Sequence, residues 1–168
     1  FFTVYNIGDS HESRAFGDHK DESVNPKEMI LAPYHPDLPE IRNTYAKYSS
    51  AISKMDSLVG QAIENLKQDG LYEDTIIVYN SDHGGVLARS KRFLYSSGIH
   101  CPLIVRIPEK WKHLFHHNKG SRVSTFTEFV DFAPTVLGLV GVESPGYMQG
   151  LPFIGPDSDI ERKYVHGN

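Results

Sequence analysis

One long amphipathic segment constrains the fold more than any other feature of the chain. Its apolar residues recur at steps of three and four, which places them on one stripe of an α-helix, and they are Leu38, Ile41, Tyr45, Tyr48, Ile52, Met55, Val59, Ile63 and Leu66. Asp37 followed three residues later by Glu40 is typical of a capping box. Pro39 suits the first turn of a helix, and Gly70 suits its end. The pattern therefore predicts a helix from about Leu38 to Asp69.

Three short apolar runs predict β-strands before and after this helix: Phe1–Asn6, Thr75–Asn80 and Pro102–Ile107. The second run is rich in β-branched residues and apolar on both faces, as a strand buried from both sides requires. A strand, a long helix and a second strand form a βαβ unit, whose right-handed crossover makes the two strands parallel. Because Phe126–Leu139 adds a further helical pattern, the expected fold class is α/β, an open, mostly parallel sheet with helices on both faces.

Size and charge narrow the classes of protein that fit. At roughly 150 residues per domain, 168 residues predict one globular unit. The formal net charge of −4 argues against a broad surface for nucleic acid or anionic membrane. The longest nearly apolar stretch, Phe132–Val142, is too short to span a bilayer. The single cysteine, Cys101, excludes an internal disulfide and a multi-cysteine zinc site.

Polar residues follow the first two predicted strands, at residues 6–12 and 80–85. Ligands in open α/β sheets bind outside the carboxyl ends of the strands, and parallel strands would bring both segments to one edge. Asp82 and His83 supply a carboxylate and an imidazole side by side, which suits a divalent metal ion, although the same residues also suit an ordinary turn. His11 is either a proton donor or anion contact at this edge, or simply a loop histidine.

Three cations, Arg89, Lys91 and Arg92, follow these polar residues within a short distance along the chain. Such a cluster suits a tetrahedral oxyanion, phosphate or sulfate, because the charge of the anion must be neutralised as it binds and reacts. We therefore expect Lys91 to contact the reacting group and the two arginines to bind substrate. A flexible basic loop at the surface is the alternative.

The motifs along the chain resemble those of the sulfatases, which belong to the alkaline-phosphatase-like superfamily. Their order carries the resemblance, and they are the stretch from Tyr45 through Asp56, Ser81-Asp82-His83-Gly84, Lys91, Leu94-Tyr95, Gly98, Pro102-Leu103-Ile104-Val105 and Thr127–Thr135. The surroundings of His11, Asp82 and Lys91 are most similar to the heparan N-sulfatase, or N-sulfoglucosamine sulfohydrolase, branch. The resemblance implies that the intact enzyme hydrolyses sulfate esters or N-sulfate groups of a sulfated small molecule or sulfated glycan.

The resemblance also implies a role for individual residues. Asp82 and His83 match a pair of ligands for a metal that is usually calcium in this family, while the imidazole would also suit Mn²⁺ or Zn²⁺. His11 matches a histidine that contacts the sulfate or assists the leaving group. Lys91 matches a basic residue that binds sulfate oxygens.

The chain departs from the family at the nucleophile. The family's formylglycine is made from Cys or Ser in a Cys/Ser-x-Pro-x-Arg motif, which residues 1–168 do not contain. Cys101 directly precedes Pro102 and fits a buried thiol in a strand. We expect residues 1–168 to form a single unit, the middle-to-C-terminal portion of a sulfatase catalytic domain. The formylglycine would then lie in the missing N-terminal part, and the isolated fragment would hold half of the active site and show no turnover.

Two other functions fit the same residues. A phosphodiesterase or phosphonate hydrolase of the same superfamily would use the same metal pair and the same cations. A non-catalytic α/β module could bind an oxyanion at the same edge of the sheet. The resemblance further implies a periplasmic, secreted or lysosomal location, with the rest of the sulfatase chain as the partner of this segment.

Overall fold

The structure, a computed structural model, describes residues 1–15, 23–158 and 162–166. The chain divides into two compact units. Unit 1 comprises Phe1–Tyr72 and Tyr79–Leu103, and unit 2 comprises Glu73–Val78 and Ile104–Asn168.

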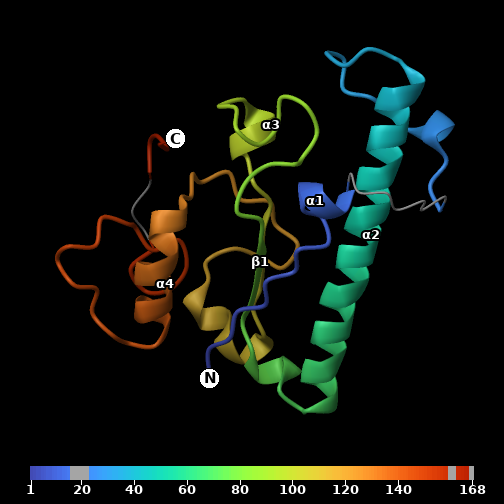
Figure 1. The fold of residues 1–168 in the computed structure, drawn as a ribbon. Coiled ribbons are helices and arrows are strands. Elements are labelled where there is room, and N and C mark those ends of the chain that lie inside the picture. The colour runs from blue at the N-terminus through green and yellow to red at the C-terminus, as the bar shows by residue number, and fades with distance from the viewer. Residues whose placement is uncertain (16–22, 159–161, 167–168) are drawn as a thin grey trace. The chain divides into compact units, whose positions relative to one another are not determined.

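The predicted long helix is confirmed as α2 (Pro39–Gln68), the dominant element of unit 1 (Figure 1). It ends as the sequence predicts, because Gly70 adopts the left-handed conformation (φ 69°) that a residue just beyond a helix favours. Its predicted capping box is wrong. The Asp37 carboxylate instead pairs with the guanidinium of Arg42, at 2.7 Å to Nη2, and Leu38 at the N-cap makes no side-chain cap.

Three short helices accompany α2 in unit 1, namely α1 (Glu12–Ala15), η1 (Pro26–Glu28) and α3 (Ser96–Ile99). The first two contact α2 directly. The long polar stretch between the N-terminal segment and α2 is therefore attached to the helix at two points, as far as its residues are described.

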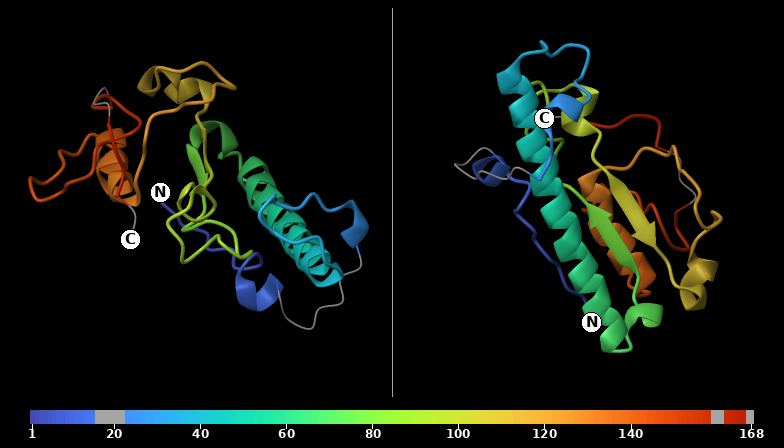
Figure 2. Two further views of the ribbon diagram at one scale, coloured as in Figure 1. Left: turned by 90° about the horizontal axis from the view of Figure 1, so that it is seen from above. Right: turned by 90° about the vertical axis from the view of Figure 1, so that its right-hand side faces the viewer.

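Two of the three predicted strands are confirmed, in shorter form, as β1 (Ile77–Asn80) and β2 (Leu103–Arg106). They pair in one two-stranded sheet and run in opposite directions (Figure 2). The expectation of parallel strands is thus wrong for this pair. Parallel neighbours need a crossover that returns the chain to its starting edge, whereas residues 81–102 reverse its direction through the loop that carries α3.

The predicted strand Phe1–Asn6 is not a strand in the structure. A strand is defined by hydrogen bonds to a neighbour, and the only sheet within the described residues consists of β1 and β2. Phe1 is accordingly 83% exposed. The expected βαβ unit, and the open parallel sheet built from it, are therefore not formed by the described part of the chain.

Unit 2 is built around α4 (Phe132–Leu139), which follows the 3₁₀ turn η4 (Phe129–Asp131). The helix predicted over Phe126–Leu139 is confirmed only over this later part. Pro134 is tolerated because it lies in the first turn, where its missing N–H needs no partner. Within the described residues, two further 3₁₀ segments are η2 (Tyr72–Asp74) and η3 (Glu109–Leu114).

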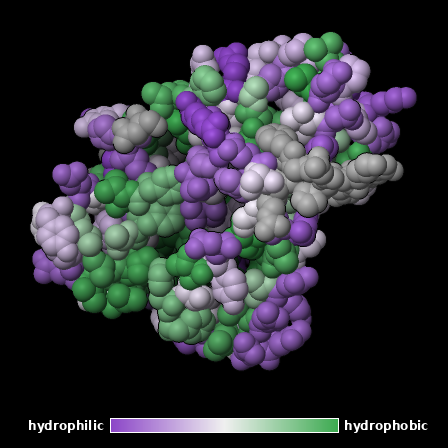
Figure 3. All heavy atoms as spheres, viewed as in Figure 1, coloured by the Kyte–Doolittle hydropathy of each residue, from purple (hydrophilic) through white to green (hydrophobic). Residues whose placement is uncertain are grey.

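Few apolar side chains are buried. Ala46 in unit 1 and Ile154 in unit 2 are the buried hydrophobic residues among those described, and hydrophobic residues are visible on the surface in Figure 3. None of the helices in the described ranges combines the length and apolar character that crossing a bilayer requires.

Candidate active site

Unit 1 contains all six side chains that the sequence singles out, and three segments carry them. The first segment is the His11 turn, residues 8–13, and the second is the turn that follows β1, residues 81–85. The third is the cation loop, residues 88–95, which carries Arg89, Lys91 and Arg92.

The His11 turn is anchored on the middle of α2. The hydroxyl of Ser10 lies 3.6 Å from the thioether sulfur of Met55, and Lys54 Nζ lies 2.7 Å from a carboxylate oxygen of Asp9. Both partners on α2 are consecutive residues, so the helix fixes the position of the turn that presents His11.

The His11 ring is oriented by its own turn. The backbone N–H of Ser13 donates to His11 Nδ1 at 3.3 Å, and the Ser13 hydroxyl lies 2.9 Å from the same nitrogen. A nitrogen that accepts from a backbone N–H carries no proton in the neutral ring, so the proton resides on Nε2. Nε2 has no hydrogen-bond partner among the described residues, and it is therefore free to donate to a ligand.

Glu12 joins the His11 turn to the cation loop. Its carboxylate lies 3.1 Å from Lys91 Nζ and 3.0 Å from Arg92 Nη2. The hydrogen bond from Lys91 is the main reason why the pKa of the Glu12 carboxyl is lowered, and the positive charge of Arg92 adds to the effect. The side chain of Lys91 is only 12% exposed. Sequence reasoning did not assign a role to Glu12, because nothing in the local pattern connects it to cations eighty positions away.

Asp82 and His83 place a carboxylate oxygen and a ring nitrogen side by side in the turn that follows β1. His83 Nδ1 lies 2.7 Å from the carbonyl oxygen of Gly84 and must donate to it, which leaves the lone pair of the neutral ring on Nε2. Nε2 lies 3.7 Å from an oxygen of the Asp82 carboxylate, whose side chain is 88% exposed. Metal-binding histidines commonly donate their second ring N–H to a carbonyl in this way.

Asp82 and His83 could supply only part of the coordination shell of a metal ion. Calcium takes six to eight oxygen ligands, and zinc takes four ligands of nitrogen, sulfur or oxygen. No group of three or more His, Cys, Asp or Glu side chains that could hold a metal occurs within the residues that the structure describes. The pair therefore fits two ligand positions, and a complete site would need further ligands from elsewhere.

Not all the predicted site residues are brought into contact. Over the described ranges, no hydrogen bond or ion pair links Asp82 or His83 to His11 or to the three cations. The structure thus joins the His11 turn to the cation loop through Glu12, and presents the Asp82–His83 pair separately in the same unit.

Glycines allow the segments around the site to approach closely. The N–H of Gly84 donates to the carbonyl of Gly98 at 2.7 Å, and a Cβ on Gly84 would lie 1.9 Å from the carbonyl oxygen of Ser97. A Cβ on Gly98 would lie 2.1 Å from the Phe93 oxygen and 2.4 Å from the Ser90 oxygen. Because real Cβ atoms do not approach so closely, both positions require glycine.

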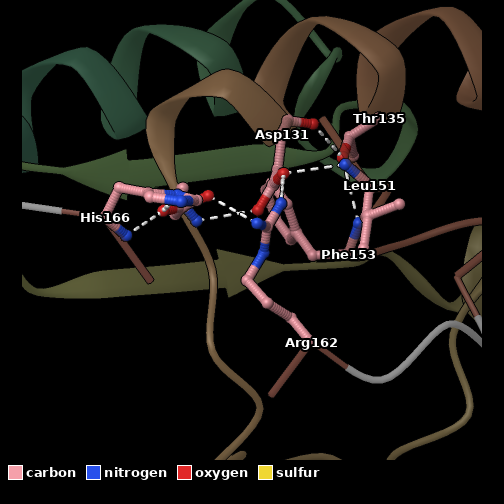
Figure 4. Close-up of polar contacts among 7 residues, drawn as sticks. Asp131, Thr135, Leu151, Phe153, Arg162 and His166 are labelled. Carbon is pink, nitrogen blue, oxygen red and sulfur yellow. Dashed lines mark hydrogen bonds and ion pairs between the residues drawn. The ribbon is translucent and has the colours of Figure 1, made fainter. Parts of the chain in front are cut away.

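A second polar cluster lies in unit 2 and was not predicted (Figure 4). Asp131, with a side chain only 2% exposed, forms an ion pair with Arg162 and accepts the backbone N–H groups of Leu151 and Glu128, each at 2.7 Å. Glu128 also pairs with Arg162, at 2.5 Å. Hydrogen bonds from the His166 backbone, ahead of other causes, lower the pKa of the Glu128 carboxyl.

The cluster holds the C-terminal segment to η4 and α4. Thr135 supports it by donating to the Asp131 carbonyl at 2.6 Å and accepting from the N–H of Phe153 at 3.1 Å. Because these ion pairs and hydrogen bonds join segments that are far apart along the chain, the arrangement is that of a structural lock. Its members are spread over residues 128–166, which explains why no local motif revealed it.

Comparisons with known proteins identify the family. The sulfatase sequence model matches residues 1–142. The chain is 35% identical over 163 residues to the ulvan-active sulfatase of Formosa agariphila, a match that covers 96% of this chain and 26% of that protein. It is 26% identical over 127 residues to the N-sulphoglucosamine sulphohydrolase of Homo sapiens, a match that covers 75% of this chain and 24% of that protein.

A solved structure has a similar fold. The phosphonate monoester hydrolase SpPMH of Silicibacter pomeroyi matches with a TM-score of 0.60 and 29% identity, over 86% of this chain and 28% of that protein. The chain thus spans about a quarter of the length of the relatives it matches. The N-sulfoglucosamine sulfohydrolase branch that the motifs suggested is matched at lower identity than the ulvan-active enzyme, so the comparisons support the family but not that branch.

Proposed function

We propose a function from one established premise, that this chain belongs to the sulfatase family. The chain contributes part of the site at which a longer enzyme hydrolyses a sulfate ester or N-sulfate group, with residues 1–168 as the middle-to-C-terminal portion of the catalytic domain. The observation that carries the proposal is the contact of Glu12 with Lys91 and Arg92, which ties a cation with a 12% exposed side chain to the turn that presents His11.

The residues of unit 1 have distinct roles in this proposal. Water cleaves the S–O or S–N bond of the substrate, and the products are sulfate and an alcohol or amine. Lys91 binds sulfate oxygens with the N–H donors that Glu12 leaves unused. His11 donates the Nε2 proton to the leaving atom, for which its ring orientation is already set. Arg89 and Arg92 bind the remainder of the substrate.

Asp82 and His83 would hold part of a divalent ion's coordination shell. Calcium is the first candidate for this ion, and Mn²⁺ or Zn²⁺ are the alternatives. Together with a formylglycine from outside residues 1–168, it would supply charge neutralisation and the nucleophile, as sulfatases typically require. The substrate class is a sulfated small molecule or sulfated glycan.

The experiment uses the whole protein to which this segment belongs, assayed with 4-nitrophenyl sulfate. We expect Asp82→Ala to reduce kcat/KM by at least about a thousandfold, because one ligand of the ion is lost. Asp157→Ala, which removes an exposed carboxylate in unit 2, is the control and should retain wild-type activity. Near-normal turnover of the Asp82→Ala enzyme would reject the ligand role.

The fold match to a phosphonate monoester hydrolase favours a second candidate, hydrolysis of a phosphonate monoester or phosphodiester. The same metal pair and cations suit a phosphoryl group. Phenyl phenylphosphonate and 4-nitrophenyl sulfate, compared by kcat/KM on the same enzyme, distinguish the two candidates. A preference for the phosphonate would replace the sulfatase proposal.

A further inference from the structure

Four planar groups form a cluster between the cation loop and the segment before α2: the guanidinium of Arg89 and the rings of Tyr34, Phe93 and Tyr95. The guanidinium carbon of Arg89 lies 4.6 Å from the ring centroid of Tyr34 and 4.2 Å from that of Tyr95. Phe93 in turn stacks on Tyr95, with centroids 6.1 Å apart and planes inclined by 22°. Arg89 is exposed, yet aromatic rings cover its planar group.

This cluster leaves the hydrogen-bond donors of the Arg89 guanidinium unused within the described residues. A guanidinium contacts rings through its faces, whereas its five N–H donors point outward in its plane. None of these donors has an acceptor within the described residues. The neighbouring cations differ, because Lys91 and Arg92 are both paired with Glu12.

The backbone of Arg89 is held in a conformation that a free surface arginine seldom adopts. Its φ is 62°, in the left-handed region that costs a non-glycine residue roughly 1 kcal/mol. The Ser97 hydroxyl donates to its carbonyl at 2.5 Å. Such conformations persist only where surrounding contacts fix them, and they concentrate at functional sites.

A histidine fastens the loop immediately before Arg89. His35 Nε2 lies 3.0 Å from the carbonyl oxygen of Ala88 and donates to it, while the Tyr45 hydroxyl, 2.6 Å away, donates to His35 Nδ1. Since Tyr45 belongs to α2, the helix positions His35 and, through it, the cation loop. The guanidinium is therefore oriented before any ligand arrives, which reduces the entropy lost on binding.

We propose that Arg89 is the binding site for a second anionic group of the ligand, distinct from the sulfate that Lys91 takes. The group is a carboxylate or a second sulfate on a saccharide, because a guanidinium edge pairs with either oxyanion through two parallel hydrogen bonds. The inference rests on the proposed function for the role of Lys91, and it makes Arg89 a specificity-determining residue.

The test measures binding to the whole protein to which this segment belongs, by NMR titration at pH 7 with labelled arginine, which detects weak affinities. Three probes are compared: glucose 6-sulfate, glucose 3,6-disulfate and glucuronic acid 3-sulfate. We expect one or both of the doubly anionic probes to bind about tenfold more tightly than glucose 6-sulfate, the gain of one charged hydrogen-bonded pair. The probe that gains identifies the second group as sulfate or carboxylate, and the Nε–H signal of Arg89 should shift only with that probe.

Variants separate this inference from the proposed function. Arg89→Ala should remove the tenfold preference for the doubly anionic probe. Arg89→Lys keeps the charge but not the planar edge, and it should lose most of that preference. Arg122→Ala removes an exposed arginine of unit 2 and should leave the preference intact. Backbone NMR spectra verify that each variant is folded.

Three results would overturn the inference. In the first, the preference survives in Arg89→Ala. In the second, glucose 6-sulfate binds in a manner that depends on Lys91, but doubly anionic probes bind no better, so that the proposed function stands while the inference fails. In the third, no probe binds, and the inference fails together with the proposed sulfate site.

Discussion

At the scale of single residues, the site depends on one carboxylate that local sequence patterns do not reveal. Charge clustering drew attention to Arg89, Lys91 and Arg92, but it could not show which of them would be neutralised by the chain itself. Glu12 forms ion pairs with two of these three cations, Lys91 and Arg92. Pairing over eighty positions is a product of tertiary structure, and it was therefore invisible to reasoning based on nearby spacing.

The lowered pKa of Glu12 makes its ion pairs sensitive to acid. A carboxyl whose pKa is depressed by folding contributes stability that is fully present above its unfolded value, about 4.5, and lost as the pH falls through the lower folded value. We expect the NMR signals of the Lys91 and Arg92 side chains to change as the pH falls below about 4.5. Glu12→Gln should show no such change, whereas an unaltered titration in the variant would mean that another group is responsible.

At the scale of elements, the sequence identifies segments well and their arrangement poorly. The three-and-four spacing of α2 and the apolar runs of β1 and β2 are local signals, and all three elements form. The direction of β2 depends on where residues 81–102 lead the chain, and the state of Phe1–Asn6 depends on a pairing neighbour that the described chain lacks. The direction of β2 and the conformation of Phe1–Asn6 are therefore not encoded in the residues of those segments themselves.

The contact of the cation loop with α3 can be tested through glycine. Gly98→Ala should destabilise the chain by about 1–3 kcal/mol, because its Cβ would clash with the carbonyls of Ser90 and Phe93. Gly60→Ala is a matched control within α2, where a Cβ meets nothing within 4 Å, and it should stabilise by about 0.5–1 kcal/mol. Urea unfolding of the whole protein to which the segment belongs measures the change in the free energy of unfolding for both variants. Equal effects of the two substitutions would argue against close packing at Gly98.

The lock in unit 2 can be tested through its buried acid. Asp131→Ala should destabilise by about 3–5 kcal/mol, because it leaves Arg162 with one fewer partner and two backbone N–H groups unpaired. Asp157→Ala removes an exposed acid from the same unit and should change the free energy of unfolding by less than about 0.5 kcal/mol. A small effect at Asp131 would show that the C-terminal segment is held by other contacts.

At the scale of the whole molecule, apolar surface is the dominant feature. Large hydrophobic side chains such as Phe2, Tyr5 and Ile104 are exposed, while Ala46 and Ile154 are the buried hydrophobic residues of the described chain. Apolar burial is the main stabilising term in folding. This distribution agrees with a chain that spans about a quarter of the length of its relatives.

The isolated chain should accordingly be marginally stable. We expect it to increase the fluorescence of the dye ANS strongly at pH 7 and to unfold over a broad range of urea, since exposed apolar surface binds the dye. The whole protein to which the segment belongs should bind much less dye per residue. A sharp, cooperative transition without dye binding would show that residues 1–168 form a self-sufficient domain.

The attachment of Arg89 to Tyr34 and His35 has an evolutionary consequence. The residues that orient this arginine precede α2, far along the polypeptide from Lys91 and from the turn after β1. If Arg89 selects ligands as proposed, substitutions near position 34 would change which ligands bind and would leave Lys91 and His11 untouched. Selectivity could then diverge in this lineage through mutation of the segment before α2 alone.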